Sequence, residues 1–197
     1  MCKIKLNIKE LEKLHLNQIH NVYIDMDGVL ADHYGYLAKM VGMSSKDFNK
    51  YITSFATREE REGYIFPLIM QSVEEEAFIK ASPLIPCFSK FKLLVDYWLD
   101  LGLNVEILSS GMHNPDTYKE IVRQKQIWLI NNDFNYIKAN FVNGSKYKQN
   151  YANEHSLLID DFDRNIQQWT DKNGKAILHV NMETTLAELN KIGIPLI

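Results

Sequence analysis

Cysteine is scarce in this chain of 197 residues, and a large excess of either charge is missing. The two cysteines, Cys2 and Cys87, cannot build a disulfide framework or a CxxC metal site, so we expect ordinary thiols in a reducing compartment. The formal net charge is -3, which gives no whole-protein attraction to nucleic acid or to anionic lipid.

Long apolar runs are missing as well. No stretch approaches the roughly 20 apolar residues that a transmembrane helix needs, and residues 1–18 mix charges with leucines, unlike a signal peptide. We therefore expect a cytoplasmic protein with no membrane partner, in which residues 1–20 form a helix packed on the core. Hydrophobic residues make up 46% of the chain and charged residues 24%, which is the balance of a globular domain with a full core.

Short apolar runs alternate with segments of helical periodicity along most of the chain. The runs predict strands over 21–24, 104–108, about 136–142, 156–159 and 176–180. The segments between them predict helices over 88–101, 114–129, 165–170 and 184–191. Strands that alternate with helices indicate an α/β fold with a parallel sheet and right-handed crossovers.

About sixty residues, from Asp32 to Pro86, interrupt this alternation after the first strand. A simple crossover needs far fewer residues. We therefore predict a small helical insertion over about 33–85, within a single domain whose core is formed by about 1–32 and 86–197. Pro83 and Pro86 would mark the return to the core, since proline is disfavoured inside helices and strands.

Two carboxylates, Asp25 and Asp27, directly follow the strand 21–24. Residues two apart on extended backbone face the same side, so these like charges would lie together. Their repulsion is relieved by a hard cation such as Mg²⁺, which prefers carboxylate oxygens. Gly28 permits the sharp turn that brings the backbone close to a ligand.

A second acidic pair, Asp160 and Asp161, follows the strand 156–159 in the same way. The carboxyl ends of parallel strands form the mouth of the sheet, where ligands bind. The two pairs can therefore meet around one ion, and we predict a Mg²⁺ site formed by Asp25, Asp27, Asp160 and Asp161.

These motifs together resemble the signatures of the haloacid dehalogenase superfamily. The sequence DMDGVLAD, over 25–32, looks like the first signature; VEILSS, over 105–110, looks like the second; and LLIDD, over 157–161, looks like the fourth. The third is a lone lysine before the fourth strand, for which Lys148 fits best and Lys146 is the rival. The resemblance implies a three-layer Rossmann-like fold with a small helical cap inserted after the first strand.

Within that superfamily, the chain resembles the 5'(3')-deoxyribonucleotidases and related phage and bacterial nucleotidases. The likeness rests on DMDGVLAD, the short insertion, the serine pair at 109–110 and the lysine-and-tryptophan segment at 125–128. The chain departs from that family at Gly111, where proline is common, and at Phe162, where arginine is common. Both departures weaken the assignment of the substrate, but they leave the expected fold and chemistry unchanged.

The resemblance implies a Mg²⁺-dependent phosphatase in which Asp25 attacks phosphorus and forms an aspartyl-phosphate. Asp27 would protonate the leaving oxygen and then activate water, while its backbone carbonyl binds the ion. Asp161 would be a further ligand, and Asp160 would act through water or orient the other ligands.

The same resemblance assigns residues to the phosphoryl group. Ser109 would donate a hydrogen bond to a phosphoryl oxygen, with help from Ser110 and the backbone near Gly111. Lys148 would neutralise Asp25 and the transferring phosphate. Lys125 is a further candidate ligand of the phosphate, although lysines on helices usually face solvent.

The expected substrate is a (deoxy)nucleoside monophosphate. The alternatives are a phosphatase of polynucleotide ends, a phosphosugar phosphatase or mutase, and a degenerate domain that only binds a partner. The chain has no basic strip interleaved with aromatics, so nucleic acid is not favoured. Exposed aromatics on the insertion would allow a homodimer.

Two features of the insertion have alternative interpretations. The rings of Tyr51, Phe55, Tyr64 and Phe66 could stack on a nucleobase, but a small core within the insertion is the favoured interpretation. Asp32 either assists near the site or caps the first helix of the insertion.

Overall fold

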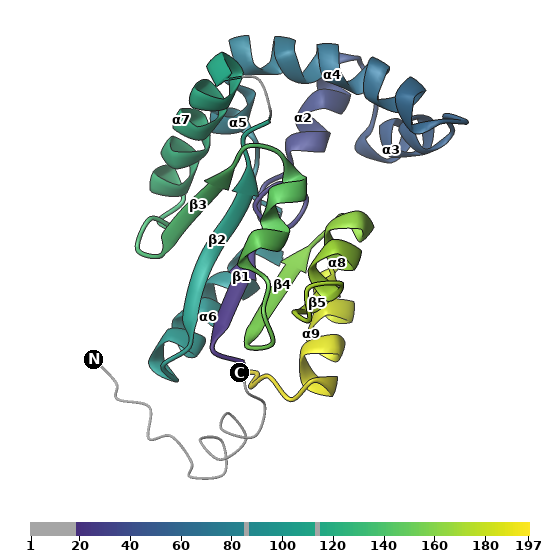
Figure 1. Ribbon diagram of the computed structural model, residues 1–197. Helices are drawn as coiled ribbons and strands as arrows, with labels where there is room; N and C mark the ends of the chain where they lie inside the picture. The colour runs from purple at the N-terminus through teal and green to yellow at the C-terminus, as the bar shows by residue number, and fades with distance from the viewer. Residues whose placement is uncertain (1–18, 85–86, 113–114) are drawn as a thin grey trace.

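The computed structural model describes residues 19–84, 87–112 and 115–197 (Figure 1). Its centre is a five-stranded sheet in which all strands run parallel, in the order β3-β2-β1-β4-β5. The strands are β1 (Asn21–Ile24), β2 (Asn104–Ser110), β3 (Lys138–Val142), β4 (Ser156–Asp160) and β5 (Lys175–Leu178). The predicted α/β class with a central parallel sheet is confirmed.

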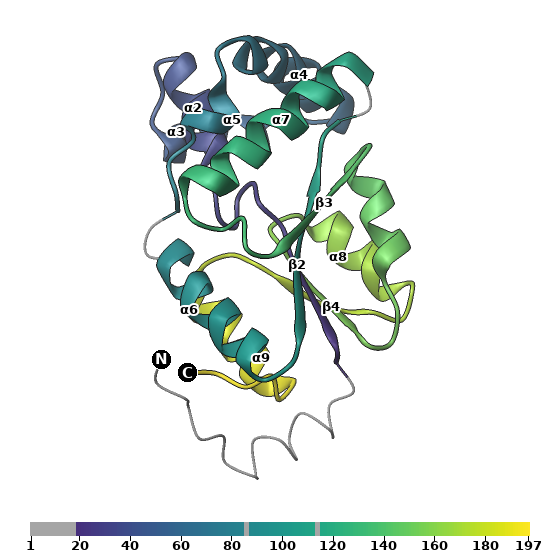
Figure 2. The ribbon, with the colours of Figure 1, turned by 90° about the vertical axis from the view of Figure 1, so that its left-hand side faces the viewer.

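Helices cover both faces of the sheet, which gives three layers (Figure 2). The helices that follow the insertion are α6 (Cys87–Asp100), α7 (Pro115–Asn131), the 3-10 helix η1 (Ser145–Tyr151), α8 (Asp163–Thr170) and α9 (Met182–Lys191). Helices α6 and α9 lie on one face, while α8 and η1 lie on the other.

The alternation of side chains along β1 explains why both faces need covering. Val22 and Ile24 pack into the larger apolar cluster, which includes Trp98 of α6. Tyr23 points the other way and packs against Trp169 of α8, with the two rings 5.5 Å apart. A strand with apolar residues on both sides is stable only when both sides are buried.

Several predicted boundaries are corrected. Strand β2 continues to Ser110 instead of ending at Leu108, because its pairing with β3 extends that far. Strand β5 ends at Leu178 instead of Val180, because the chain turns there so that Asn181 can cap α9 with its side chain. The predictions for residues 1–18 and for the helix start at 114 lie outside the described residues.

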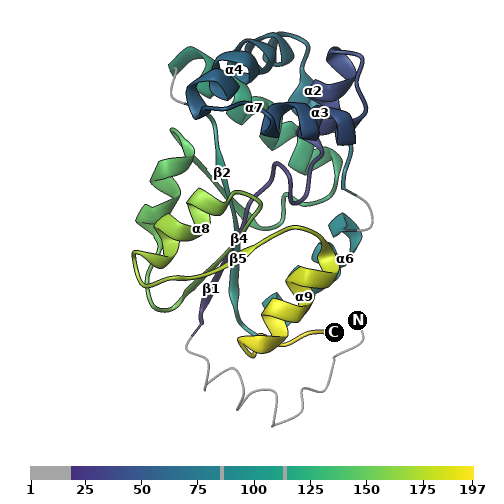
Figure 3. The same ribbon diagram turned by 90° about the vertical axis from the view of Figure 1, so that its right-hand side faces the viewer.

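Four helices lie between β1 and α6, above the end of the sheet where the strands finish (Figures 1 and 3). They are α2 (His33–Met40), α3 (Ser45–Thr53), α4 (Arg58–Glu74) and α5 (Ala77–Lys80). Their small core contains the buried side chains of Leu37, Ala38, Phe48 and Ile52.

Helix α7 packs against this insertion. The indole of Trp128 donates to Ala81 O at 2.8 Å, and the amide of Gln124 donates to Val73 O at 2.7 Å. These bonds fix one face of α7 against the insertion above the sheet. Among the described residues, no helix combines the length and the apolar character that crossing a membrane requires.

Candidate functional site

Strand β1 ends in a tight loop. The N–H of Asp25 donates to Ile159 O on β4 at 2.9 Å, and the N–H of Gly28 donates to Ala31 O at 2.9 Å. Gly28 has a φ of 76°, and a Cβ placed there would lie 2.0 Å from Oδ2 of Asp161. Only glycine fits this position, and its missing side chain lets the Asp161 carboxylate approach the loop.

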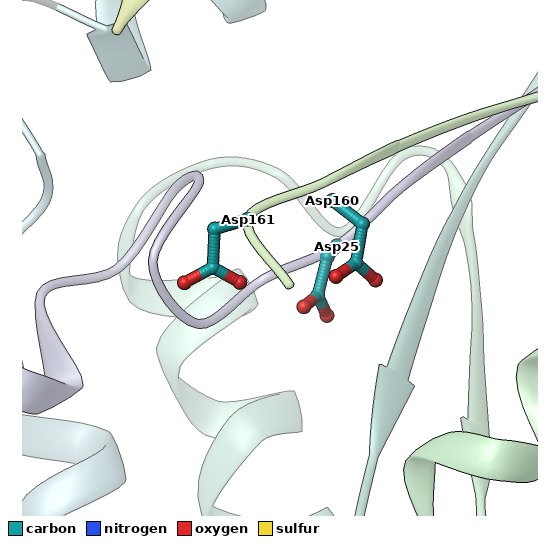
Figure 4. A group of neighbouring side chains, drawn as sticks. All are labelled: Asp25, Asp160 and Asp161. Atoms are coloured by element: carbon teal, nitrogen blue, oxygen red, sulfur yellow. The ribbon is translucent and has the colours of Figure 1, made fainter. Parts of the chain in front are cut away.

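Three carboxylates converge where β1 and β4 finish (Figure 4). Asp25, Asp160 and Asp161 each offer an oxygen atom, and these atoms all lie within 4.8 Å of one another. Asp25 follows β1, Asp160 ends β4, and Asp161 is the next residue. The register that pairs Ile24 with Ile159 brings the two strand ends together.

The environment makes full ionisation of this cluster costly. Burial raises the pKa of Asp25 to about 6; Lys148 opposes this shift, while Asp160 and Asp27 add to it. Burial, followed by the charges of Asp25 and Asp160, raises the pKa of Asp161 to about 8. In the absence of a further cation, Asp25 and Asp161 therefore hold protons more readily than carboxylates in water do.

Lys148 is the buried cation of the cluster. Its Nζ lies 2.8 Å from Oδ1 of Asp25 and 2.7 Å from Oδ2 of Asp160, and its side chain is 3% exposed. Burial alone would lower the pKa of Lys148, but the two carboxylates more than offset it and raise the net pKa. Lys148 therefore stays an ammonium that joins β1 to β4.

Asp160 is held on all sides. The side-chain amide of Asn165 donates to both of its oxygens, at 2.9 and 3.0 Å, and the N–H of Phe162 donates at 2.9 Å. With Lys148 on Oδ2, both oxygens are already engaged. Asp160 is thus placed to orient Lys148, whereas Asp25 and Asp161 have more capacity for a further ligand.

A second ion pair lies beside the first. Nζ of Lys125, from α7, donates to Oδ2 of Asp27 at 2.5 Å, to Ser109 Oγ at 2.9 Å and to Ser110 O at 2.8 Å. Burial works to raise the pKa of Asp27, but Lys125 and then His33 and Lys148 lower it to a net value below the ordinary one. Asp27 is therefore held as a carboxylate.

Ser109 and Ser110 end β2 beside this pair, and Gly111 follows them. Ser109 is fully buried under Lys125, and Ser110 Oγ accepts from the N–H of Met112 at 3.3 Å. The N–H of Gly111 already donates to Val142 O at 2.9 Å, so this amide is not available to a phosphoryl oxygen. Gly111 instead makes room for a ring, since a Cβ there would lie 2.6 Å from the side chain of Tyr118.

The residues present fit a divalent metal ion. When all four carboxylates (Asp25, Asp27, Asp160 and Asp161) are ionised, they stand against two ammonium groups, and a divalent cation would balance the two remaining negative charges. Oδ1 of Asp27 is also buried, and no group of the described residues forms a hydrogen bond with it. Hard oxygen donors with excess negative charge are the donor set that Mg²⁺ prefers.

The structure brings the predicted site residues together in two adjoining groups. The first contains Asp25, Asp160, Asp161 and Lys148, and the second contains Asp27, Lys125, Ser109 and Ser110. Lys146, the rival of Lys148, is exposed, and its Nζ lies 5.0 Å from the centre of the Tyr147 ring. Asp32 caps α2, since its Oδ1 accepts from the N–H of Gly35 at 2.8 Å.

Sequence reasoning missed three neighbours of the site. Asn165 holds Asp160; His33 stacks on Phe78 with ring centres 3.9 Å apart and interacts electrostatically with Asp27; and Tyr34 lies near the carboxylates. The sequence did contain a signal for Asn165, because its side chain is an amide in the first helical turn after the acidic pair 160–161. Nothing in the sequence marks His33 or Tyr34, because their placement depends on how the insertion packs.

No family model matches this sequence, and no curated protein matches it. Among solved structures, a hydrolase from Streptococcus pneumoniae TIGR4 is similar, with a TM-score of 0.52 and 13% identity over 88% of this chain and 99% of that chain. A structure of L-2-haloacid dehalogenase from Xanthobacter autotrophicus also matches, with a TM-score of 0.49 and 13% identity over 88% of this chain and 83% of that chain. The likeness to the Streptococcus hydrolase shows that this chain shares its fold.

Proposed function

We propose that this protein is a Mg²⁺-dependent phosphomonoesterase that works through an aspartyl-phosphate on Asp25. One observation carries the proposal. Oδ1 of Asp25 is fixed by Lys148 Nζ at 2.8 Å and by the N–H of Met26 at 2.7 Å. Within the described part of the chain, no hydrogen bond or ion pair engages the other oxygen, Oδ2. The carboxylate is thus oriented, with one oxygen left to act as a nucleophile.

A metal ion at this site would neutralise charge on the phosphoryl group and help align it for in-line displacement. Asp25 and Asp161 are the side chains proposed to hold it, and the backbone carbonyl of Asp27 is proposed as a third ligand. Asp160 supports them through Lys148 and Asn165, since its own oxygens are already bonded.

We propose two chemical steps for these side chains. In the first, the substrate displaces Asp27 from Lys125 and Asp27 takes up a proton from solvent; Oδ2 of Asp25 then bonds to phosphorus, the bond to the leaving oxygen breaks, and Asp27 delivers its proton to that oxygen. In the second, Asp27 takes a proton from water, the water oxygen bonds to phosphorus, and the bond between Asp25 and phosphorus breaks. The pairing with Lys125 favours the carboxylate form of Asp27 that the second step needs.

The proposed role of Lys125 and Ser109 is to stabilise the phosphoryl oxygens. Both are buried, and the bond of 2.9 Å between them means that Ser109 Oγ helps to aim the ammonium. A phosphoryl group that enters would compete with Asp27 for Lys125, which would release Asp27 to exchange protons. Preorganised donors of this kind are the largest source of rate enhancement in many enzymes.

The proposed substrate is a (deoxy)nucleoside monophosphate. The support is the resemblance of DMDGVLAD and of the segment 125–128 to the deoxyribonucleotidases, and the contact of that segment with the insertion through Trp128. The rings of Tyr51, Phe55 and Tyr64 contact one another at 5.2 to 5.6 Å, which fits a small core within the insertion.

The test is phosphate release from nucleoside monophosphates, sugar phosphates and phosphorylated oligonucleotides, each with Mg²⁺ and with a chelator. We expect Mg²⁺-dependent release from mononucleotides and none from an Asp25→Asn variant that keeps the wild-type fold. Substantial activity in that variant would contradict the role of Asp25. Release mainly from oligonucleotide ends would instead support the alternative function.

A further inference from the structure

The ring of Phe78, from α5 of the insertion, meets the ammonium of Lys125. Nζ of Lys125 lies 5.1 Å from the centre of that ring, within the distance of about 6 Å over which an aromatic face attracts a cation. Both residues are buried, with 1% of Lys125 and 4% of Phe78 exposed, and this attraction is stronger where water is excluded. None of the chemical steps proposed for Asp25 and Asp27 uses Phe78.

The ammonium of Lys125 has no hydrogen left for another acceptor. Its three N–H groups donate to Asp27 Oδ2, Ser109 Oγ and Ser110 O. An aromatic face attracts the positive charge without requiring one of these hydrogens. Phe78 can therefore hold the ammonium in place while one of its hydrogen bonds passes from Asp27 to a phosphoryl oxygen.

The Phe78 ring is itself held by two other helices of the insertion. The ring of His33, from α2, stacks on it with the centres 3.9 Å apart and the planes at 13°. The hydroxyl of Ser72, from α4, donates to Ile69 O at 2.8 Å and lies 3.3 Å from Nε2 of His33. Since the one hydroxyl hydrogen is used by Ile69, the His33 ring donates to Ser72, and this bond fixes the ring that stacks on Phe78.

Helix α5 is fastened to α7 directly beside Lys125. The fully buried side chain of Gln124 accepts from the N–H of Phe78 at 3.3 Å and donates to Val73 O at 2.7 Å. Gln124 precedes Lys125 in α7, so these two bonds to the backbone of the insertion bring Phe78 next to Lys125. The place of the insertion above the sheet thereby sets the surroundings of this ammonium.

We infer that Phe78 is a positioning residue for phosphoryl transfer, whose ring holds the Lys125 ammonium between Asp27 and the incoming phosphoryl group. It acts through Lys125, and the stacked ring of His33 keeps it in place. The inference rests on the proposed phosphatase function and gives the insertion a part in the chemical step. The alternative role is packing alone, because Phe78 also belongs to a small apolar cluster with Val73 and Ile121.

A double-mutant cycle separates these two roles. Phe78→Leu keeps an apolar side chain and removes the ring, and Lys125→Met removes the cation. With 4-nitrophenyl phosphate, whose good leaving group keeps slow variants measurable, we expect Phe78→Leu to lower kcat/KM about tenfold in the wild type. In Lys125→Met, the same change should lower kcat/KM less than about twofold, because its target is gone. Phe48→Leu, in the small core of the insertion, is the matched control and should change kcat/KM less than about twofold in the wild type.

Fluorination of the Phe78 ring tests the charge without removing the ring. One, two and three fluorine atoms progressively weaken the negative potential of the ring face and change the shape of the side chain little. We expect log(kcat/KM) to fall steadily with the number of fluorine atoms in the wild type and to stay level in Lys125→Met. The same substitutions at Phe48 should leave it level, since a packing role does not depend on the potential of the ring.

Equal losses from Phe78→Leu with and without Lys125, or a level fluorine series at Phe78, would overturn the inference and leave the proposed phosphatase standing. Absence of Mg²⁺-dependent release by the wild type, from 4-nitrophenyl phosphate and from mononucleotides, would overturn both proposals. Thermal melting identifies a folding defect in Phe78→Leu, and the fluorinated proteins, which keep the ring, then decide between positioning and packing.

Discussion

The ammonium of Lys148 lies 2.8 Å from Oδ1 of Asp25, the proposed nucleophile. It also lies 2.7 Å from Oδ2 of Asp160, so a single buried cation joins the ends of β1 and β4. Since Lys148 comes from η1, a short helix between β3 and β4, the geometry of the site depends on a segment outside the strands that carry its carboxylates.

Replacing Lys148 by Met should remove this cation with little change in volume. Two buried carboxylates would lose their partner, and breaking a buried ion pair in this way costs about 3–5 kcal/mol. We expect kcat to fall at least about 100-fold, because the nucleophile loses its orientation and its counterion. Urea unfolding and steady-state kinetics measure the two effects.

Lys146→Met is the matched control. Lys146 lies in the same helix but is exposed, so its removal should change the free energy of unfolding by less than about 0.5 kcal/mol. Equal losses of activity in the two variants would contradict the assignment of Lys148.

Gly28→Ala should damage the site through Asp161. The added Cβ would lie 2.0 Å from Oδ2 of Asp161, and alanine also resists a φ of 76°. The carboxylate must move away from the loop, so we expect the Mg²⁺ concentration for half-maximal activity to rise at least about tenfold. A titration of activity with Mg²⁺ measures this shift.

Gly63→Ala provides the contrast. Gly63 lies inside α4, and a Cβ there meets no atom within 4 Å. Alanine favours helix, so this variant should gain up to about 1 kcal/mol in the free energy of unfolding and keep its Mg²⁺ dependence. A loss of Mg²⁺ affinity in Gly63→Ala would show that the effect of Gly28→Ala does not require contact with Asp161.

The sequence predicts the sheet and the carboxylates well, because both depend on local pattern. Asp25 and Asp160 follow apolar runs of strand length, and parallel pairing then brings their strand ends together. Lys125 shows the limit of that reasoning. Helical periodicity places Lys125 on the apolar face of α7 with Ile121 and Trp128, and the structure buries all three. Periodicity does not say that this lysine meets Ser109, which is 16 residues away in the chain; that contact depends on how α7 packs against the insertion.

Mg²⁺ should stabilise the protein more at pH 8 than at pH 5. The pKa of Asp161 is raised to about 8 in the folded protein, whereas an unfolded Asp titrates near 4. Between these values the folded protein binds more protons than the unfolded chain, so the stability of the metal-free protein falls as pH rises through this window. At high pH, Asp161 is ionised and Mg²⁺ supplies the positive charge that neutralises it. At low pH, Mg²⁺ must first displace the proton from Asp161.

Thermal melting with Mg²⁺ and with a chelator, at each pH, measures this linkage. Asp161→Asn should flatten the pH dependence of the metal-free protein and remove most of the Mg²⁺ effect. A Mg²⁺ stabilisation of equal size at pH 5 and pH 8 would show that the proton on Asp161 does not compete with the ion.

His33 should make the fold sensitive to acid in the opposite sense. Burial lowers the pKa of His33 to about 4; Asp27 opposes this shift and Lys125 adds to it. The unfolded histidine titrates near 6.5, so between pH 6.5 and pH 4 the unfolded chain binds the extra proton and stability is lost as pH falls.

His33→Gln removes that proton, and Gln can still reach Ser72, the hydrogen-bond partner of the His33 ring at 3.3 Å. Urea unfolding at pH 7 and pH 4.5 should therefore show that the wild type loses more stability than the variant over this interval. Equal losses of stability in the two proteins would contradict this prediction. They would mean that the His33 ring can be protonated in the folded protein without breaking its contact with Phe78.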